Sequence, residues 1–284
     1  MLVKNWIRSG WHWMAVPALL CLSATASAQN FGSPDSPTSG NTRSVRGGQQ
    51  DITTASDESD VRRRARIRLE LASAYFSRGD LRTALDEVKQ VLVIDGDFSD
   101  ALELRALIYD ALNEPALADE SFAKAIQADP RNGSVLHNHG WYLCRKQQYA
   151  RADEQFAKAL QQSLSVFPAK TLLARGVCQN MAGQVEAAGK TLLRSYELDP
   201  TNPATAFNLA RVLMVQGDLQ RARFYIRRVN GVPEQANPES LWLGIRIEQK
   251  LGNMTERDEL AASLRSRFPS AREVTALELG RFDE

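Results

Sequence analysis

The sequence predicts an all-α fold, a right-handed superhelical solenoid of six repeats of one helix pair with a C-terminal capping helix. Three spacings predict it. Glycine or alanine recurs every 34 residues, with one step of 36; an alanine follows twelve positions later, and a large apolar residue four positions after that. The three series are Ala72, Ala106, Gly140, Gly176, Ala210 and Gly244; Ala84, Ala118, Ala152, Ala188 and Ala222; and Val88, Phe122, Phe156, Leu192 and Ile226.

This spacing is the signature of the tetratricopeptide repeat (TPR). Two helices of a pair approach closely only where the facing side chains are small, which explains both small positions. Gly79-Asp80 and Gly217-Asp218 are expected between the helices, because glycine accepts the left-handed conformation and aspartate caps the next helix. Asp129-Pro130 and Asp199-Pro200 are expected to end the second helix, since proline disfavours helix in the preceding residue and suits a first turn. The repeats are expected near residues 65–98, 99–132, 133–168, 169–202, 203–236 and 237–270.

The sixth repeat departs from the pattern at two positions. Glu256 stands where the small alanine belongs, and Gly252 comes one residue late. Terminal repeats of a solenoid are commonly atypical, because they have a neighbour on one side only. We therefore expect a terminal repeat followed by a capping helix near Ser270–Leu279.

The N-terminus has the features of an export signal. Lys4 and Arg8 precede a short apolar run that ends in small residues, which predicts a signal peptide over residues 1–28. Residues 29–63 are polar and contain almost no large apolar side chains, so we expect a disordered linker before a solenoid over residues 64–284.

Cys21 raises an alternative, because lipidation of this cysteine would anchor the protein in a membrane. Leu20 is too large for the residue that precedes a lipidated cysteine, whereas Ala26-Ser27-Ala28 is a sound cleavage site. Cleavage after Ala28 and a soluble periplasmic protein are therefore favoured over the lipid-anchored form.

Composition and motifs argue against catalysis. A formal net charge of +1 gives no electrostatic reason to expect nucleic-acid binding. The chain has neither a glycine-rich phosphate loop nor a plausible nucleophile–base pair, so we expect no catalytic residues, cofactor or small-molecule substrate. His137 and His139 are of a type that binds zinc, but residues two apart on a helix point about 200° apart. No metal site is therefore expected, and both histidines are expected to face solvent or a groove.

Two cysteines remain after removal of the signal peptide, Cys144 and Cys178. An even number in an oxidising compartment favours a disulfide. The repeat frame places them on the first helices of repeats 3 and 4, pointing toward one another with an axial offset of about 3 Å. A bridge between these repeats is favoured, and two separately buried thiols are the alternative.

The first helices of TPR arrays line a groove that often holds a peptide. Asn138 and Asn208 occupy the same position in repeats 3 and 5, where an amide can pair with a ligand backbone. Phe76, Trp141 and Phe207 occupy positions that usually face the groove, and aromatic rings are common anchors. Alternatively, each side chain packs against the next repeat.

Two stretches carry a resemblance to a known family: LADESFAKAIQADPRNGSVLHNHGWYLC (117–144) and SLWLGIRIEQKLGN (240–253). With the 36-residue step, they resemble the type IV pilus biogenesis and stability proteins of the PilF/PilW pilotin group. The resemblance implies an outer-membrane-associated periplasmic scaffold whose partners are the outer-membrane pilus secretin and other pilus assembly proteins. It also implies that a secretin segment binds at Phe76, Leu107, Asn138 and Trp141. A chaperone or adaptor for other envelope assembly machinery is the alternative.

Overall fold

The computed structural model describes residues 60–162 and 167–283, all within one compact unit. In these ranges the regular structure consists of thirteen α-helices, with no strand. The helices are α2 (Asp60–Ser77), α3 (Leu81–Ile94), α4 (Ser99–Ala111), α5 (Pro115–Ala128), α6 (Gly133–Arg145), α7 (Tyr149–Gln161), α8 (Pro168–Met181), α9 (Val185–Leu198), α10 (Pro203–Val215), α11 (Leu219–Asn230), α12 (Pro238–Leu251), α13 (Met254–Arg267) and α14 (Arg272–Glu278).

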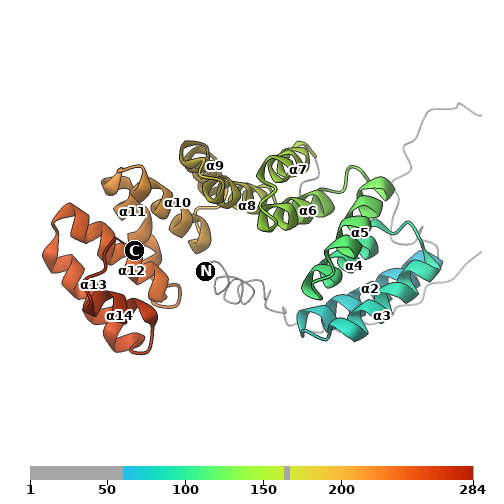
Figure 1. The fold of residues 1–284 in the computed structure, drawn as a ribbon, viewed down its shortest axis with the longest axis horizontal. Helices are drawn as coiled ribbons and strands as arrows, with labels where there is room; N and C mark the ends of the chain where they lie inside the picture. Colours follow the sequence, from blue (N-terminus) through green and yellow to red (C-terminus); the bar gives the residue numbers. More distant parts are fainter. Residues whose placement is uncertain (1–59, 163–166, 284) are drawn as a thin grey trace, which may run out of the picture. The chain divides into compact units, whose positions relative to one another are not determined.

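The helices pack as six successive pairs, from α2 with α3 to α12 with α13 (Figure 1). Each pair corresponds to one predicted repeat. The last helix, α14, lies where a capping helix was expected, and its Val274 joins the apolar cluster formed by α12 and α13. The predicted all-α TPR architecture is confirmed.

Small residues occur where the two helices of a pair approach most closely. A Cβ atom at Gly140 would lie 2.9 Å from the ring of Phe156. A Cβ atom at Gly176 would lie 2.6 Å from Cγ of Leu192. Both distances are below ordinary van der Waals contact, so even an alanine would require Phe156 or Leu192 to shift.

The turns within repeats follow the predicted chemistry. Gly79 and Gly217 both adopt a φ of 80°, the left-handed conformation that glycine tolerates. The following aspartates, Asp80 and Asp218, cap α3 and α11 by accepting hydrogen bonds from backbone N–H groups. These short turns fix the relative direction of the two helices in repeats 1 and 5.

The prolines of the Asp-Pro pairs lie outside the helices. Asp129 and Asp199 end α5 and α9 as expected, but Pro130 and Pro200 lie in the turn and not in the first turn of the next helix. That helix begins a few residues later, where Asn132 caps α6 and Asn202 caps α10 through their side-chain oxygens. The sequence prediction missed these asparagine caps.

The features predicted for the N-terminus lie mostly outside the described residues. The signal peptide predicted for residues 1–28, Cys21 and residues 29–59 lie there. Residues 60–63, assigned to the linker from sequence, instead form the first turn of α2. Arg62 in this turn forms an ion pair with Asp95, and its guanidinium lies 4.1 Å from the centroid of the Phe98 ring.

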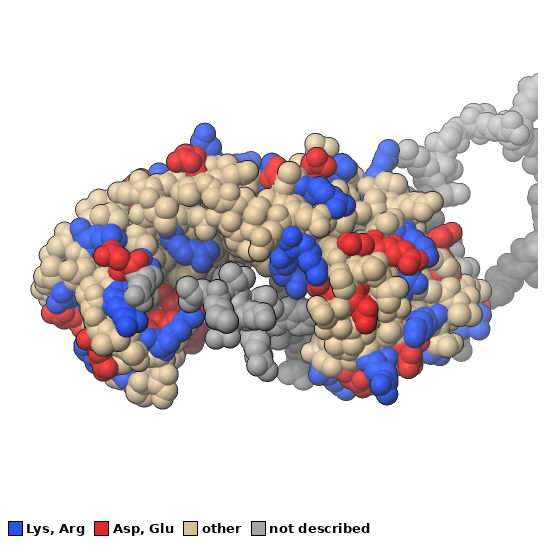
Figure 2. All heavy atoms as spheres, viewed as in Figure 1, with Lys and Arg blue, Asp and Glu red and all other residues tan. Residues whose placement is uncertain are grey.

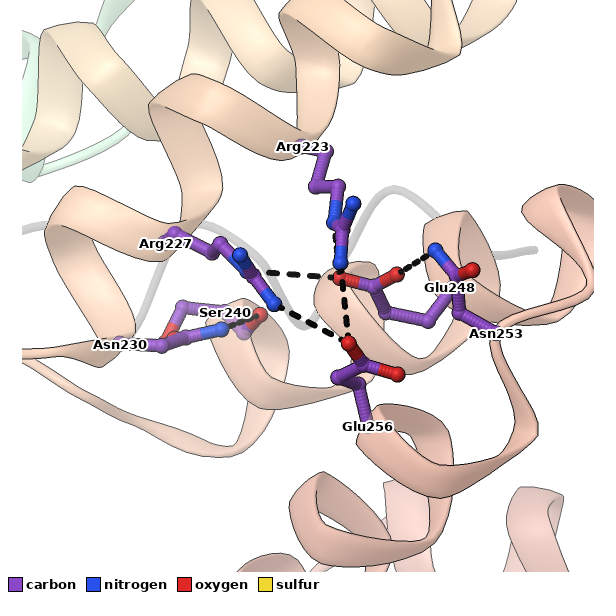
Figure 3. Close-up of polar contacts among 7 residues, drawn as sticks. All are labelled: Arg223, Arg227, Asn230, Ser240, Glu248, Asn253 and Glu256. Atoms are coloured by element: carbon purple, nitrogen blue, oxygen red, sulfur yellow. Dashed lines mark hydrogen bonds and ion pairs between the residues drawn. The ribbon is translucent and has the colours of Figure 1, made fainter.

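An ion-pair network joins repeats 5 and 6 (Figure 3). Glu248 of α12 is only 2% exposed and accepts from Arg223 Nε at 2.9 Å and from Asn253 Nδ2 at 2.7 Å. Arg223 also reaches Glu256 of α13, at 3.2 Å, and Arg227 lies 3.6 Å from both carboxylates. Glu256, which breaks the small-residue pattern, therefore takes part in an inter-repeat contact.

No helix within residues 60–162 and 167–283 combines the length and the apolar character that crossing a lipid bilayer requires.

Candidate protein-binding site

An apolar stripe is exposed on α2, the first helix of the first repeat. Ile67 and Leu71, one turn apart, are 57% and 45% exposed. At the position of Ile67, the next two repeats carry Ala101 and Val135, which are fully buried. Ala101 packs there against Val91 of the preceding repeat. Because no described repeat precedes α2, its corresponding surface is open.

This stripe forms one wall of a cleft of about 630 Å³. Ile67, Leu71 and Ile94, at the end of α3, supply apolar surface. Arg64 and Arg68 also line the cleft, and Arg68 is paired with Glu87 at 2.7 Å. Clustered apolar side chains at a protein surface commonly mark a binding site for another protein. The lining suits an apolar segment that carries an acidic residue beside Arg64.

Sequence reasoning missed this cleft because it followed the usual groove positions of a TPR array. The positions of Ile67 and Leu71 are packing positions in a continuous array, so their apolar character drew no attention. One signal was present, however. An end repeat is expected to have a polar outer face for solubility, and here the sequence places isoleucine and leucine on it.

The predicted groove residues of apolar type are all half-buried. Leu107 and Trp141 pack on the same apolar cluster, in repeats 2 and 3. Phe76 and Phe207 pack on two other clusters. The structure thus brings Leu107 and Trp141 together and leaves the other two at separate places along the array.

The two asparagines differ in their surroundings. Asn138 is half-buried and donates from Nδ2 to the carboxylate of Glu103 in the preceding repeat. Asn208 is 7% exposed and bonded within its own helix, donating to the Ala204 carbonyl at 2.8 Å and accepting from Arg211 at 2.7 Å. Only Asn138 therefore lies in a polar cluster shared between repeats.

Glu103 is the acidic member of that cluster and was not singled out from sequence. It is 6% exposed, and Ser134 donates to the same carboxylate oxygen as Asn138, at 3.4 Å. Burial raises the pKa of Glu103 to about 7, and the two hydrogen bonds offset only part of this effect. The only sequence signal was its place in α4, at a position that carries leucine, histidine or phenylalanine in the other repeats.

The two histidines contact different repeats. His137 Nδ1 lies 3.0 Å from Thr171 Oγ1 of repeat 4, whereas His139 stacks on Phe122 of repeat 2 with 4.9 Å between ring centroids. Burial lowers the pKa of each to about 4. His139 is only 8% exposed, so the expectation that it faces solvent or a groove was wrong. The described residues contain no group of three metal-ligating side chains that could hold an ion.

Cys144 and Cys178 form a disulfide between α6 and α8. Their Cα atoms are 5.8 Å apart, and both residues are buried. This is the bridge favoured from the repeat frame, and it joins the first helices of repeats 3 and 4.

Comparison with known proteins identifies the family. Residues 99–132 and 137–203 match models of the tetratricopeptide repeat. The crystal structure of PilW, a widely conserved type IV pilus biogenesis factor, is 30% identical in sequence and superposes with a TM-score of 0.70. The match covers 78% of this chain and 99% of PilW. The chain belongs to the PilF/PilW family of type IV pilus TPR proteins.

PilF of Pseudomonas aeruginosa, a type IV pilus assembly protein, supports this assignment. It is 27% identical over 234 residues, which are 82% of this chain and 92% of PilF. The solved structure of Pseudomonas aeruginosa PilF shares the fold, with a TM-score of 0.70 at 24% identity over 78% of this chain and all of that one. This PilF/PilW-family protein therefore matches its relatives over nearly their whole length.

Proposed function

We propose that this protein is a non-catalytic scaffold that binds a segment of the pilus secretin, the ring-shaped outer-membrane channel. By holding that segment it promotes secretin localisation or oligomerisation and supports stable fibres. Membership of the PilF/PilW family supports a role in type IV pilus biogenesis. The observation that carries the binding step is the apolar cleft of repeat 1.

The cleft offers anchoring sites for apolar side chains of the secretin segment. Ile67, Leu71 and Ile94 are all at least 37% exposed, so a bound segment removes further apolar surface from water. Completing the burial of such side chains contributes on the order of 1 kcal/mol each, before the cost of association. Arg64 beside them favours a segment with a neighbouring carboxylate, whereas Arg68 is already paired with Glu87.

The proposed place of action is the periplasm, with association at the outer membrane through the secretin. A soluble form cleaved after Ala28 fits this proposal better than anchoring at Cys21. Charged side chains of both signs are interspersed on the face shown in Figure 2, so this face offers no broad cationic patch to a membrane or nucleic acid. Labelling with palmitate would detect a lipid at Cys21 and contradict the soluble form.

The binding step is tested by Ile67→Asn combined with Leu71→Asn. We expect at least a tenfold weaker interaction with purified secretin, fewer secretin multimers in the envelope, and reduced piliation and twitching. Val93→Asn is the matched control, because Val93 is 80% exposed on α3 and does not line the cleft. Normal secretin binding by the double variant would contradict the proposed cleft.

A deletion strain tests the secretin role itself. Loss of secretin multimers together with loss of pili is the expected result. Normal multimers, piliation and twitching would contradict it, and capture of other envelope proteins by the purified chain would then favour the adaptor function. A normal deletion strain would thus contradict the secretin role, whereas normal secretin binding by the double variant would contradict only the place of binding.

A further inference from the structure

The helix α11 exposes an aromatic ring where the other repeats carry a charge. Phe224 is 53% exposed. In each other repeat, the residue at this position is charged and exposed, so only repeat 5 replaces the charge with a large apolar side chain. The corresponding residues are Asp86, Glu120, Glu154, Lys190 and Asp258.

The same helix is strongly basic. It contains four arginines and no carboxylate. Arg221 is paired with Asp218, at 3.3 Å, and the network in Figure 3 neutralises Arg223 and Arg227. Three of the four positive charges therefore already have anionic partners in the array.

Arg228 is different, since it forms no ion pair within the described residues. Its guanidinium lies over two rings, 5.6 Å from the centroid of Phe224 and 5.9 Å from that of Tyr196. An arginine held against aromatic rings keeps its positive charge and loses some of its freedom to move, which prepares it for a carboxylate. Phe224 beside it supplies apolar surface.

These residues line a second cleft, of about 400 Å³. Its walls are formed by Gln220, Arg223, Phe224, Arg227 and Arg228. The cleft belongs to the second helix of repeat 5, whereas the cleft proposed for the secretin belongs to repeat 1. It is therefore a separate surface, and its apolar surface comes from an aromatic ring, whereas that of the repeat 1 cleft comes from aliphatic side chains.

We propose that this α11 cleft docks an acidic segment of a partner protein. In the bound state, a carboxylate of the segment pairs with Arg228, and an adjacent apolar side chain packs on Phe224. Charge complementarity identifies the occupant, because α11 supplies one cation without an ion-pair partner in the described residues together with a ring beside it. The protein thus has two docking surfaces and can bring two partners together.

A membrane surface is a poorer occupant than a peptide. Binding to anionic lipid gains about 1 kcal/mol for each basic residue near the surface, and several are needed for stable attachment. Among the described residues no carboxylate pairs with Arg228, and Phe224 is the only large apolar side chain that lines the cleft. One carboxylate and one apolar contact match a short segment of protein.

The test uses the full chain and a short fluorescein-labelled peptide in which glutamates alternate with leucine and phenylalanine. Fluorescence anisotropy should show saturable binding that weakens about tenfold in Arg228→Glu and in Phe224→Ser. Lys158→Glu is the matched control, since Lys158 is exposed at the position of Arg228 in repeat 3. Circular dichroism verifies that each variant is folded.

Two further probes separate the alternatives. A peptide with lysines in place of the glutamates, and one with serines in place of the apolar residues, should both bind at least tenfold more weakly. Failure of the acidic peptide to bind, or equal binding by Arg228→Glu, would overturn the proposal. Sedimentation with phosphatidylglycerol vesicles that is lost in Arg228→Glu would assign the surface to a membrane and overturn it as well.

Discussion

Glu103 couples the stability of the protein to pH through a single buried carboxylate. In the unfolded chain its pKa has the ordinary value of 4.5, whereas burial raises it to about 7 in the folded protein. Between these values the folded state holds a proton that the unfolded state has released. The contribution of Glu103 to the free energy of unfolding is therefore fully present below pH 4.5. It is lost as the pH rises toward 7, and the loss amounts to about 3 kcal/mol.

Glu103→Gln should remove this dependence. Glutamine keeps the shape of the side chain and the oxygen that accepts from Asn138, but it carries no charge at any pH. We expect the variant to be about as stable as the parent near pH 5 and more stable by about 2–3 kcal/mol near pH 8. Urea unfolding at the two pH values measures the difference.

The comparison with the parent also removes the contribution of the two histidines. Burial lowers the pKa of His137 and His139 to about 4, so their contribution is present above about pH 6.5 and is lost as the pH falls through 4. That trend opposes the one from Glu103 but is the same in both proteins. An equal pH dependence in Glu103→Gln and the parent would contradict the raised pKa of Glu103.

At the scale of elements, the helices of repeats 5 and 6 are joined by charge as well as by apolar packing. Within the described residues, repeat 6 is followed by the short helix α14 and not by another helix pair, so its attachment to α11 matters more than that of an internal repeat. The buried carboxylate of Glu248 meets Arg223 of α11 and Asn253 before α13 (Figure 3). One side chain thus connects all three helices.

Glu248→Ala should loosen the C-terminal end of the array. Removing one partner of a buried pair leaves Arg223 with only Glu256, at a cost of about 3 kcal/mol. Because arrays open locally, we expect faster hydrogen exchange in α12, α13 and α14 and little change in α2 to α9. Mass spectrometry of peptic fragments resolves these regions.

Glu256→Ala provides the control within the same network. Glu256 is 39% exposed, so water replaces much of its interaction with the arginines and the expected cost is below about 1 kcal/mol. Equal effects of the two substitutions would show that burial of Glu248 does not govern the attachment of repeat 6.

At the scale of the whole molecule, the spacing of small residues was sufficient to predict the six helix pairs. The reason is steric, since Gly140 and Gly176 stand where no larger side chain fits. The start of α2 was placed too late because Arg62 and its neighbours are polar, and a polar composition by itself predicts a linker. Arg62 contacts Asp95 and Phe98, which lie between α3 and α4, and local composition cannot predict contacts with residues so distant in the sequence.

The two clefts were not predicted from the sequence. The consensus groove positions describe an internal repeat with neighbours on both sides, and each cleft depends on a feature in which one repeat differs from that consensus. Ile67 is exposed because α2 stands at the end of the described array, and Phe224 because repeat 5 differs from its neighbours at one position. Comparing equivalent positions between repeats would have revealed Phe224, whereas Ile67 is unusual only because its repeat has no described neighbour on that side.

The disulfide acts on the whole array because repeats contact mainly their neighbours and the array can part at any junction. Cys144 and Cys178 cross the junction between repeats 3 and 4, which is also where the repeat spacing lengthens to 36 residues. Closing a loop with a sequence separation of 34 restricts the unfolded chain and should stabilise the fold by about 2–4 kcal/mol.

Cys144→Ala combined with Cys178→Ala should therefore lower the free energy of unfolding by that amount and speed hydrogen exchange in α6 and α8. Reductant should have a similar effect on the parent and none on the double variant, which separates loss of the bridge from loss of side-chain packing. Alkylation of the unfolded parent should add mass only after reduction. Thiols that react before reduction would show that the junction is held by packing alone, and reductant would then leave the stability of the array unchanged.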